Sequence, residues 1–433
     1  MMKLTSLKVT VIISMLYSSA MVFYSTMPSL FVVGLGFLHL VFLLQRLRRF
    51  FDVKETIFLS TILLVPTSTI SIIGHNSALF PLSWFHVLVL FLFFWLYLSE
   101  RMNKTFFLLL LCSVFYLFIL AFLERSILEA MKQVLMMLLF LMSFPIGVSL
   151  SRKPSANLLS VSADFFVLST IAFGAQVILQ RAFIKSSGIV IGHFVITGQG
   201  RFAYAGLMGD YSFATVYLAA GCMVVLIQFM EWERIRLFRF IAEEVFLLTS
   251  MLVVTARTGW AALALTLLVY FLRNIRRINW KTVLLVMFGI VAVPVVFNEL
   301  IISRVGQNLL DASGRFENYQ KAWKIIQDHP LFGVGLGSAN LYNDYSISLP
   351  HNFFIQYQLQ IGFAGICIIL AFFIVFLRKH YVKKNAIKWV FWLVVFSSMF
   401  IPDIFSSRFY YVIIIVCMLP VYRKDENVWR KSG

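Results

Sequence analysis

Residues 313–328 read Ser-Gly-Arg-Phe-Glu-Asn-Tyr-Gln-Lys-Ala-Trp-Lys-Ile-Ile-Gln-Asp, and they begin the longest stretch of this chain that does not resemble a membrane segment. The stretch continues through His329-Pro-Leu-Phe-Gly-Val-Gly-Leu-Gly337 and His351-Asn352, and then enters an apolar run. The sequence on both sides of it is dominated by long apolar segments. We therefore expect the chemistry of the protein in or near residues 313–365.

The composition predicts an integral membrane protein. Of 433 residues, 61% are hydrophobic and 13% are charged, whereas a soluble protein has roughly 25% charged residues. The apolar residues are distributed along the whole chain, which predicts a single integral membrane domain over residues 1–433. The net charge of +18 does not indicate a nucleic-acid partner, because Lys and Arg gather in the cytoplasmic loops of membrane proteins.

The lengths of the apolar runs predict the number of membrane spans, since a helix needs about 20 such residues to cross the hydrocarbon. Runs of suitable composition lie near 9–26, 28–45, 56–74, 81–98, 105–123, 127–149, 161–183, 210–230, 240–256, 258–272, 282–298, 352–377, 387–401 and 405–421. The predicted fold class is therefore an all-α, polytopic transmembrane helix bundle with about 12–14 spans.

The basic residues predict the orientation of the bundle. With the N-terminus in the cytoplasm, 26 of the 37 Lys and Arg residues fall in cytoplasmic loops, and this pattern does not invert along the chain. Both termini are therefore predicted to be cytoplasmic. The two long extracytoplasmic loops would be 184–209 and 299–351. Basic residues outside the cytoplasmic loops break the pattern and are the first candidates for function.

Arg201 lies in Gly198-Gln-Gly-Arg201, just before a predicted span. Glycines let the backbone approach a ligand closely, and the planar, permanently charged guanidinium suits phosphate oxygens. An arginine at the membrane interface can equally extend to lipid headgroups. Both interpretations of Arg201 remain open at this point.

Arg257 lies in Thr255-Ala-Arg-Thr-Gly259, between two apolar runs with almost no loop. A charge near the membrane core costs about 2.5–3.5 kcal/mol on insertion scales, so it should face a polar cavity and a partner. That partner would be a bound anion or an acidic residue elsewhere in the bundle. Arg408 occupies a similar external turn, but Asp403 could neutralise it locally, which makes its functional case weaker.

The polar stretch of residues 313–328 predicts an amphipathic helix. Phe316, Tyr319, Trp323 and Ile326 would form its apolar face, and the helix would lie on the membrane surface as a cap over the spans. Arg315 begins this helix and Pro330 ends it. The glycines of residues 333–337 follow a helix rather than a strand, which favours a tight turn over a nucleotide-binding loop.

His351 stands at the mouth of a predicted span. An imidazole has an unperturbed pKa of about 6.5 and can accept a proton at neutral pH. Alternatively, His351 only stabilises its loop through hydrogen bonds. Asn352 could orient the His351 side chain in either role. The histidines show no metal-like cluster, and the first external connection has no acidic residue. A metal-independent site without a cofactor is therefore expected.

Several of these motifs together resemble the signature of the O-antigen ligase and polymerase superfamily. They are the run from Ser313 to Gly335, His351-Asn352-x-x-Ile355-Gln356, Gly362-x-x-Gly365, Arg201 with Gly206 before a span, and Thr255-Ala-Arg257-Thr-Gly259 between spans. Their order and the long late external loop also agree with that family. They cover roughly residues 190–370.

The resemblance implies a GT-C-like membrane enzyme that transfers a glycan from a polyprenyl-pyrophosphate carrier on the outer side of a bacterial cytoplasmic membrane. The displacement would be inverting and metal-independent. By the same resemblance, Arg201 and Arg257 would bind the pyrophosphate and His351 would be catalytic. Arg315, Arg408 and Asn352 are further candidate substrate contacts.

Three functions are compared. The first is a polymerase that joins lipid-linked repeat units of O-antigen or capsule; the second is a ligase that transfers the glycan to lipid A–core. Their partners would be the lipid-linked glycan, the acceptor glycan and membrane lipids, with a chain-length regulator or flippase as a further candidate. The third is a polysaccharide transporter or flippase, which would also place arginines in a central cavity but predicts broken helices and repeat symmetry.

Overall fold

The fold is described from a computed structural model of the whole chain. Its described residues are 2–73, 82–100, 103–196, 202–274, 315–382 and 385–421. All structural statements below concern these residues.

The chain is almost entirely helical. In chain order the elements are α1 (Met2–Ala20), η1 (Met21–Thr26), α2 (Ser29–Leu47), α3 (Val53–Leu64), η2 (Val65–Thr67), α4 (Trp84–Ser99), α5 (Lys104–Ala121), α6 (Ile127–Leu141), α7 (Ser143–Arg152), α8 (Leu158–Ser187), β1 (Phe194–Ile196), β2 (Phe202–Tyr204), α9 (Tyr211–Met230), α10 (Leu237–Val254), α11 (Thr258–Asn274), α13 (Arg315–Asp328), α14 (Ala339–Tyr345), α15 (Phe353–Val375), η4 (Phe376–His380), α16 (Lys388–Ser397) and α17 (Arg408–Met418). The two short strands pair antiparallel, with Phe194 opposite Tyr204.

The all-α, polytopic fold class is confirmed. Seven helices within the described ranges are long and apolar enough to cross a membrane, and four shorter apolar helices accompany them. A described helix lies in every predicted span except 282–298, which is outside the described residues.

The starts of several helices follow from short polar side chains in the sequence. The Asp210 carboxylate accepts hydrogen bonds from the backbone amides of Ser212 and Phe213, and so caps α9. Asp52 caps α3 and Asn103 caps α5 in the same way. Such caps satisfy amides that have no partner in the first turn of a helix, which is how the sequence fixes where these apolar helices begin.

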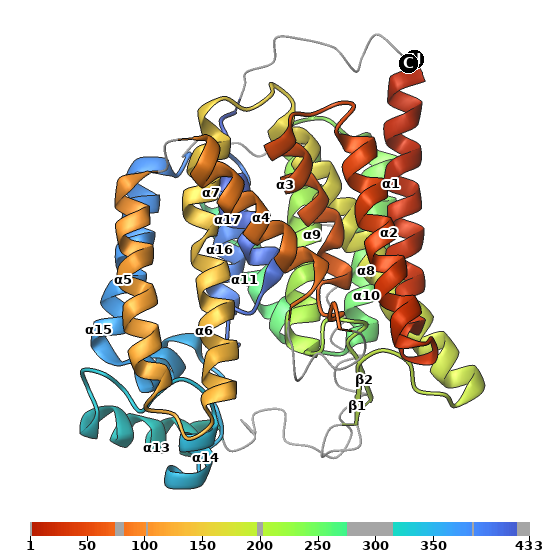
Figure 1. Cartoon of the computed structure of the whole chain (residues 1–433). Coiled ribbons are helices and arrows are strands. Elements are labelled where there is room, and N and C mark those ends of the chain that lie inside the picture. The colour runs from red at the N-terminus through yellow and green to blue at the C-terminus, as the bar shows by residue number, and fades with distance from the viewer. Residues whose placement is uncertain are drawn as a thin grey trace.

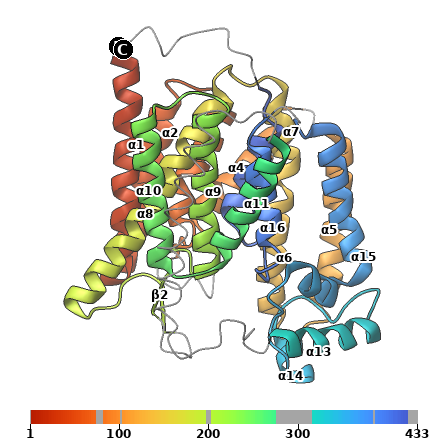
Figure 2. The ribbon, with the colours of Figure 1, turned by 180° about the vertical axis from the view of Figure 1, so that it is seen from behind.

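The small polar elements lie together at one end of the bundle. Figure 1 shows β1, β2, α13 and α14 at the end opposite the start of α1, and Figure 2 shows the same arrangement from behind. The connections after α2, α7 and α9, which carry basic residues, lie at the end where α1 begins. Helix α9 is central and almost wholly buried, and it packs against α8, α10 and α11.

Helix α15 is broken at Gly362, where φ is 60° and ψ is −173°. The loop that follows α13 fills the break with its backbone. The amides of Phe363 and Ala364 donate to the carbonyl oxygens of Pro330 (2.9 Å) and Leu331 (3.1 Å). In return, the amide of Val334 donates to the Leu359 oxygen at 2.9 Å. Backbone groups freed by a break inside a membrane must find other partners, and here the loop provides them.

The glycines that permit this contact all have positive φ, which confirms the turn predicted for residues 333–337. Gly333, Gly335 and Gly337 have φ of 69°, 103° and 124°. A Cβ atom on Gly362 would overlap the Leu331 carbonyl group. The two glycine-containing motifs are thus the two sides of one backbone contact.

Helix α13 is present as predicted, and it packs against α15. Ala322, Ile325 and Ile326, at positions i, i+3 and i+4, are buried. Of the predicted apolar face, Ile326 therefore packs against the protein, whereas Trp323 is 58% exposed. Contact of Trp323 with the membrane surface stays a prediction.

Candidate functional site

Arg257 lies in the tight turn between α10 and α11. The turn is possible because Thr255 adopts a left-handed conformation with φ of 65°. The Gly259 amide donates to the Thr215 hydroxyl of α9 at 3.3 Å, and a Cβ atom on Gly259 would overlap the Thr215 backbone. The glycine therefore lets α11 begin directly against α9, and Arg257 is held at that junction. Its side chain is mostly buried, with Nη2 shielded from solvent.

Arg201 lies outside the described residues, but its neighbour Phe202 does not. The Thr255 hydroxyl donates to the Phe202 carbonyl oxygen at 3.2 Å. Gln180 of α8 holds the same hairpin by accepting from the Gly206 amide (2.9 Å) and donating to the Ile191 oxygen (2.7 Å). The structure therefore brings the turn that carries Arg257 next to the strand that follows Arg201.

The backbone at His351 is held from two sides. The Tyr319 hydroxyl of α13 donates to the His351 carbonyl oxygen at 3.0 Å, and the Asn318 side chain donates to the Ser348 oxygen at 2.9 Å. On the other side, the Phe353 amide donates to the Ser398 oxygen at 3.0 Å. The His351 side chain itself is exposed. The imidazole is thus presented to the surroundings from a fixed loop.

Asn352 has a structural role that its prediction as a substrate contact did not include. Its side-chain oxygen accepts from the amides of Phe354 (3.0 Å) and Ile355 (3.2 Å) and caps α15. Its side-chain nitrogen donates to the Met399 oxygen at 3.2 Å. Both ends of the carboxamide therefore orient the loop beside His351.

Arg408 begins α17, and the negative charge of Asp403 acts on it. One oxygen of the Asp403 carboxylate accepts from the Tyr357 hydroxyl (2.5 Å) and from the Phe405 amide (2.9 Å). Among the described residues, Arg408 makes no direct ion pair and its Nε atom has no hydrogen-bond partner. Asp403 therefore compensates Arg408 through its charge, as the sequence suggested, and not through a direct contact.

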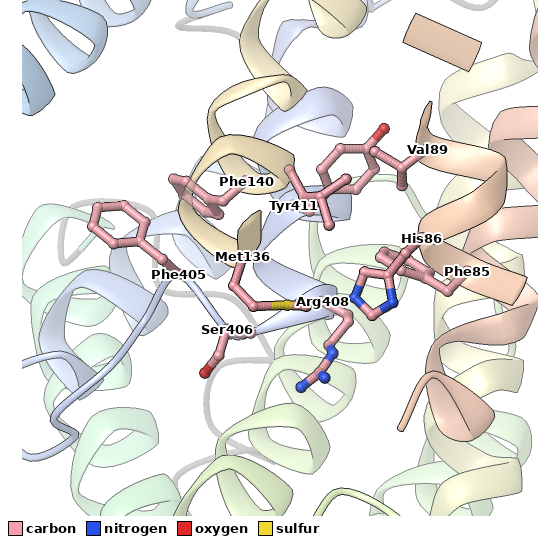
Figure 3. Close-up of a pocket in the computed structure, with 11 residues that line it drawn as sticks. Phe85, His86, Val89, Met136, Phe140, Phe405, Ser406, Arg408 and Tyr411 are labelled. Carbon is pink, nitrogen blue, oxygen red and sulfur yellow. The ribbon is translucent and has the colours of Figure 1, made fainter. Parts of the chain in front are cut away.

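Arg408 lines a pocket between α4, α6 and α17. The pocket is narrow: it leaves about 10 Å³ for the centre of a water-sized sphere, which is room for roughly one water molecule. Figure 3 shows the guanidinium of Arg408 beside the ring of His86, with Tyr411 and Met136 nearby. His86 was not singled out from the sequence. The available signal was Ser83 three residues before it at a helix start, since Ser83 and His86 form a capping box there.

The candidate residues fall into two groups at the same end of the bundle. His351 and Asn352 are tied to the turn that leads into α17 and Arg408, whereas Arg257 is tied to the hairpin that follows Arg201. In Figures 1 and 2, the hairpin and α13 lie on different sides of that end. Arg315 is the first residue of α13, and its side chain lies outside the described part. In that part, no cluster of three His, Cys, Asp or Glu side chains could hold a metal ion.

The comparisons with known proteins identify one family. Residues 244–370 match the model of a family described as O-antigen ligase. The match supports the O-antigen ligase and polymerase superfamily. The chain matched no curated protein and no solved structure in these comparisons.

The matched residues of the O-antigen ligase family include Arg257, α13, the glycine turn, His351 and the break at Gly362. Arg201 and Arg408 lie outside the match. The chain is therefore a multi-pass membrane protein, and the match over residues 244–370 supports O-antigen ligase or polymerase activity in general.

Proposed function

We propose that this protein is a glycosyltransferase that polymerises polyprenyl-pyrophosphate-linked oligosaccharide repeat units on the outer side of the cytoplasmic membrane. The observation that carries the proposal is that the turn between α10 and α11, the β1–β2 hairpin and the loop between α14 and α15 lie at the end of the helix bundle opposite the start of α1. The proposed reaction needs an arginine beside the anionic leaving group and a proton acceptor, and these segments carry candidates for both.

In the proposed reaction, the bond between the anomeric carbon and the pyrophosphate oxygen breaks. The acceptor hydroxyl oxygen attacks the same carbon from the opposite face, so the configuration inverts. Arg257, together with Arg201, stabilises the negative charge that develops on the departing pyrophosphate. His351 accepts the proton of the attacking hydroxyl, and the polyprenyl pyrophosphate leaves with the electron pair of the broken bond.

The positions of Arg257 and His351 suit these two roles. Arg257 is mostly buried in the turn between α10 and α11, where a reduced dielectric strengthens its attraction for a phosphate oxygen. The exposed His351 sits on a loop that an acceptor sugar can reach. Tyr319 and Asn352 fix that loop, and a fixed catalytic group lowers the entropic cost of reaching the transition state.

The second candidate is an O-antigen ligase that transfers the glycan from the polyprenyl pyrophosphate to lipid A–core. The description of the matched family favours it directly. Both reactions use the same donor and the same bond-breaking step, so they differ only in the acceptor. A transporter is the candidate of another class. It predicts a broken helix facing a cavity, whereas the break in α15 is filled by the backbone of residues 330–335.

One reconstitution separates these candidates. Purified protein in nanodiscs receives a polyprenyl-pyrophosphate-linked glycan alone, and the products are separated by size. Elongated lipid-linked chains support the polymerase. A reaction that starts only when lipid A–core is added supports the ligase, and no chemical change under either condition, with movement of the glycan lipid across a vesicle membrane, supports a transporter.

A further inference from the structure

A cluster of basic side chains lies between α5, α7 and η4, at the end of the bundle where α1 begins. Lys104 is the first residue of α5, Arg152 is the last residue of α7, and Lys379 belongs to η4. All three side chains are exposed. Basic residues gather at one side of membrane proteins in general, so their number alone assigns no partner to them. Their convergence from three elements that are distant in the sequence requires a further explanation.

Aromatic contacts hold the three elements together at this place. The His380 ring of η4 packs on the Phe106 ring of α5 with centroids 5.5 Å apart, and its Nε2 atom lies 3.5 Å from the Asn103 side-chain nitrogen. The Phe144 ring of α7 packs on Phe106 at 5.6 Å and on Phe376 of η4 at 5.7 Å. The three phenylalanines are fully buried. The basic side chains are therefore carried by elements whose relative positions are fixed.

Like charges act on one another in this cluster. The positive charges of Lys379 and Arg152 both act on the His380 ring. Lys104 begins α5, where the partial positive charge of a helix N-terminus disfavours a cation, and the first turn of α5 contains no acidic residue. Glu100, the acidic residue nearest to Lys104 in the sequence, is paired with a lysine of α3 at 2.8 Å. An anion held between these side chains would therefore stabilise the cluster.

Helix α15 ends in a π turn that belongs to the cluster. The Tyr381 amide donates to the Phe376 oxygen at 2.8 Å, which closes a wider turn than an α-helix has. Single π turns within helical segments occur frequently at functional sites. Here the turn contains both Lys379 and His380. The irregular end of α15 is thus the part of it that contacts α5.

Exposed apolar side chains continue from the cluster along α5 and α15. Phe107, Leu108 and Leu111 lie in the first turns of α5, and Leu370 and Ile374 lie in the last turns of α15. Their exposed fractions are 37–61%. Figures 1 and 2 show α5 and α15 side by side at the edge of the bundle. An anion at the cluster would therefore lie beside an apolar surface, which matches a lipid with a phosphate headgroup and acyl chains.

We propose that the cluster of Lys104, Arg152, Lys379 and His380 binds the phosphate headgroup of an anionic phospholipid from the adjacent leaflet. Lysine and arginine donate charge-assisted hydrogen bonds to phosphate oxygens, and basic groups between membrane helices bind such headgroups. The acyl chains lie along the exposed apolar side chains of α5 and α15. The lipid links α5, α7 and the end of α15, whose other end follows the His351 loop. It takes no part in the proposed glycan transfer, and its assignment does not rest on that function.

The test measures binding of phosphatidylglycerol to the delipidated full-length protein by native mass spectrometry in a neutral detergent. Phosphatidylcholine with the same acyl chains is the reference without net charge, and wild-type protein should bind it more weakly. Arg152→Gln and Lys379→Gln should each weaken the tightest phosphatidylglycerol step about 5-fold. Arg49→Gln and Lys8→Gln make the same changes at exposed residues of the same end. These two matched controls should leave that step unchanged.

Thermal unfolding provides a second measurement on the same proteins. Phosphatidylglycerol should raise the melting temperature of wild type and of Lys379→Arg, which keeps the charge, more than that of the Arg152→Gln/Lys379→Gln double variant. Equal weakening of lipid binding by the control variants would overturn the site, because the attraction would then come from the general charge of this end. Equal binding of phosphatidylcholine, or full competition by inorganic phosphate, would overturn the assignment of an anionic phospholipid. Neither measurement needs glycan transfer, so failure of the proposed function leaves the lipid site standing.

Discussion

The Tyr319 hydroxyl donates a 3.0 Å hydrogen bond to the carbonyl oxygen of His351. This bond joins the amphipathic helix α13 to the loop that carries the proposed proton acceptor, so α13 positions His351 as well as covering α15.

Removing the hydrogen bond between Tyr319 and His351 should lower the rate of glycan transfer, although the proposed proton acceptor, His351, is still present. A net hydrogen bond contributes about 1 kcal/mol, so Tyr319→Phe should reduce kcat by roughly 2- to 10-fold with little change in KM. Glycan transfer at saturating donor measures the effect. Tyr342→Phe alters a tyrosine that is 73% exposed and is the control. Equal rates for wild type and Tyr319→Phe would show that the bond does not position His351.

Replacing Arg257 should abolish glycan transfer while the protein still inserts. Loss of one group that stabilises a developing anion costs about 10²- to 10³-fold in kcat, and Arg257→Ala should lose at least that much. Arg257→Lys retains charge without the planar fork and should recover part of the rate. Product length and amount in reconstituted protein give the answer. Normal product from Arg257→Ala would remove Arg257 from the donor site.

Replacing His351 should slow glycan transfer without preventing binding of the lipid-linked donor. His351→Ala should still bind the lipid-linked donor but transfer about 10²- to 10⁴-fold more slowly, because the attacking hydroxyl loses its proton acceptor. Single-turnover transfer and donor binding are measured on the same preparation. His329→Ala, which removes a ring bonded to the Tyr345 hydroxyl, is the control outside the reaction centre. Full activity in His351→Ala would leave the residue with a loop-holding role only.

Gly362→Ala should destabilise the fold strongly. The residue has φ of 60°, which costs an alanine about 1–2 kcal/mol, and the new Cβ atom would also displace the Leu331 carbonyl group. Gly34→Ala is the matched control, since nothing lies within 4 Å of a Cβ atom there. Thermal unfolding in detergent should show a clear loss for Gly362→Ala and little change for Gly34→Ala. Equal melting temperatures would contradict the proposed role of the break.

Glu124 should give the contact between the α5–α6 loop and α14 a pH-dependent stability. Burial raises the pKa of this carboxyl above its usual 4.5, although the Asn340 amide bonded to it acts in the opposite direction. The folded state then binds more protons than the unfolded state above pH 4.5, so stability falls as pH rises through the raised pKa. Glu124→Gln should flatten this part of the curve of melting temperature against pH.

Glu317 is the control for the measurement of melting temperature against pH, because its pKa is shifted in the opposite direction to that of Glu124. Lys321 lowers the pKa of the exposed Glu317 carboxyl, so its small contribution is present above the unfolded pKa and is lost as pH falls. Glu317→Gln should therefore leave the decline at higher pH unchanged. The same decline in Glu124→Gln as in wild type would remove Glu124 as its source.

The helices were predictable because a membrane span leaves a long apolar run, and caps such as Asp210 mark where a run becomes a helix. Arg257 was also predictable, since a charge between two such runs has few explanations. The buried face of α13 was not, because Trp323 is large and apolar but is 58% exposed beside the buried stripe of Ala322, Ile325 and Ile326. Which face is buried depends on the packing partner, here α15.

Contacts between segments that are distant in the sequence could not be predicted either. Asp403 is close to Arg408 in sequence, yet it bonds to Tyr357 on another helix. His86 lies more than 300 residues before Arg408, and only the folded chain places both at one pocket. Gly362 was visible as part of a motif, but a glycine in an apolar run does not reveal that another segment inserts its backbone there.

The contact between Leu331 and Ala364 also constrains how this membrane protein matures. Helix α15 cannot satisfy its own backbone at Gly362, so its stable form requires residues 330–335 to be already present on the same side of the bilayer. Those residues precede α15 in the chain, so they are synthesised first. The final conformation of α15 therefore depends on the docking of a segment that is made before it.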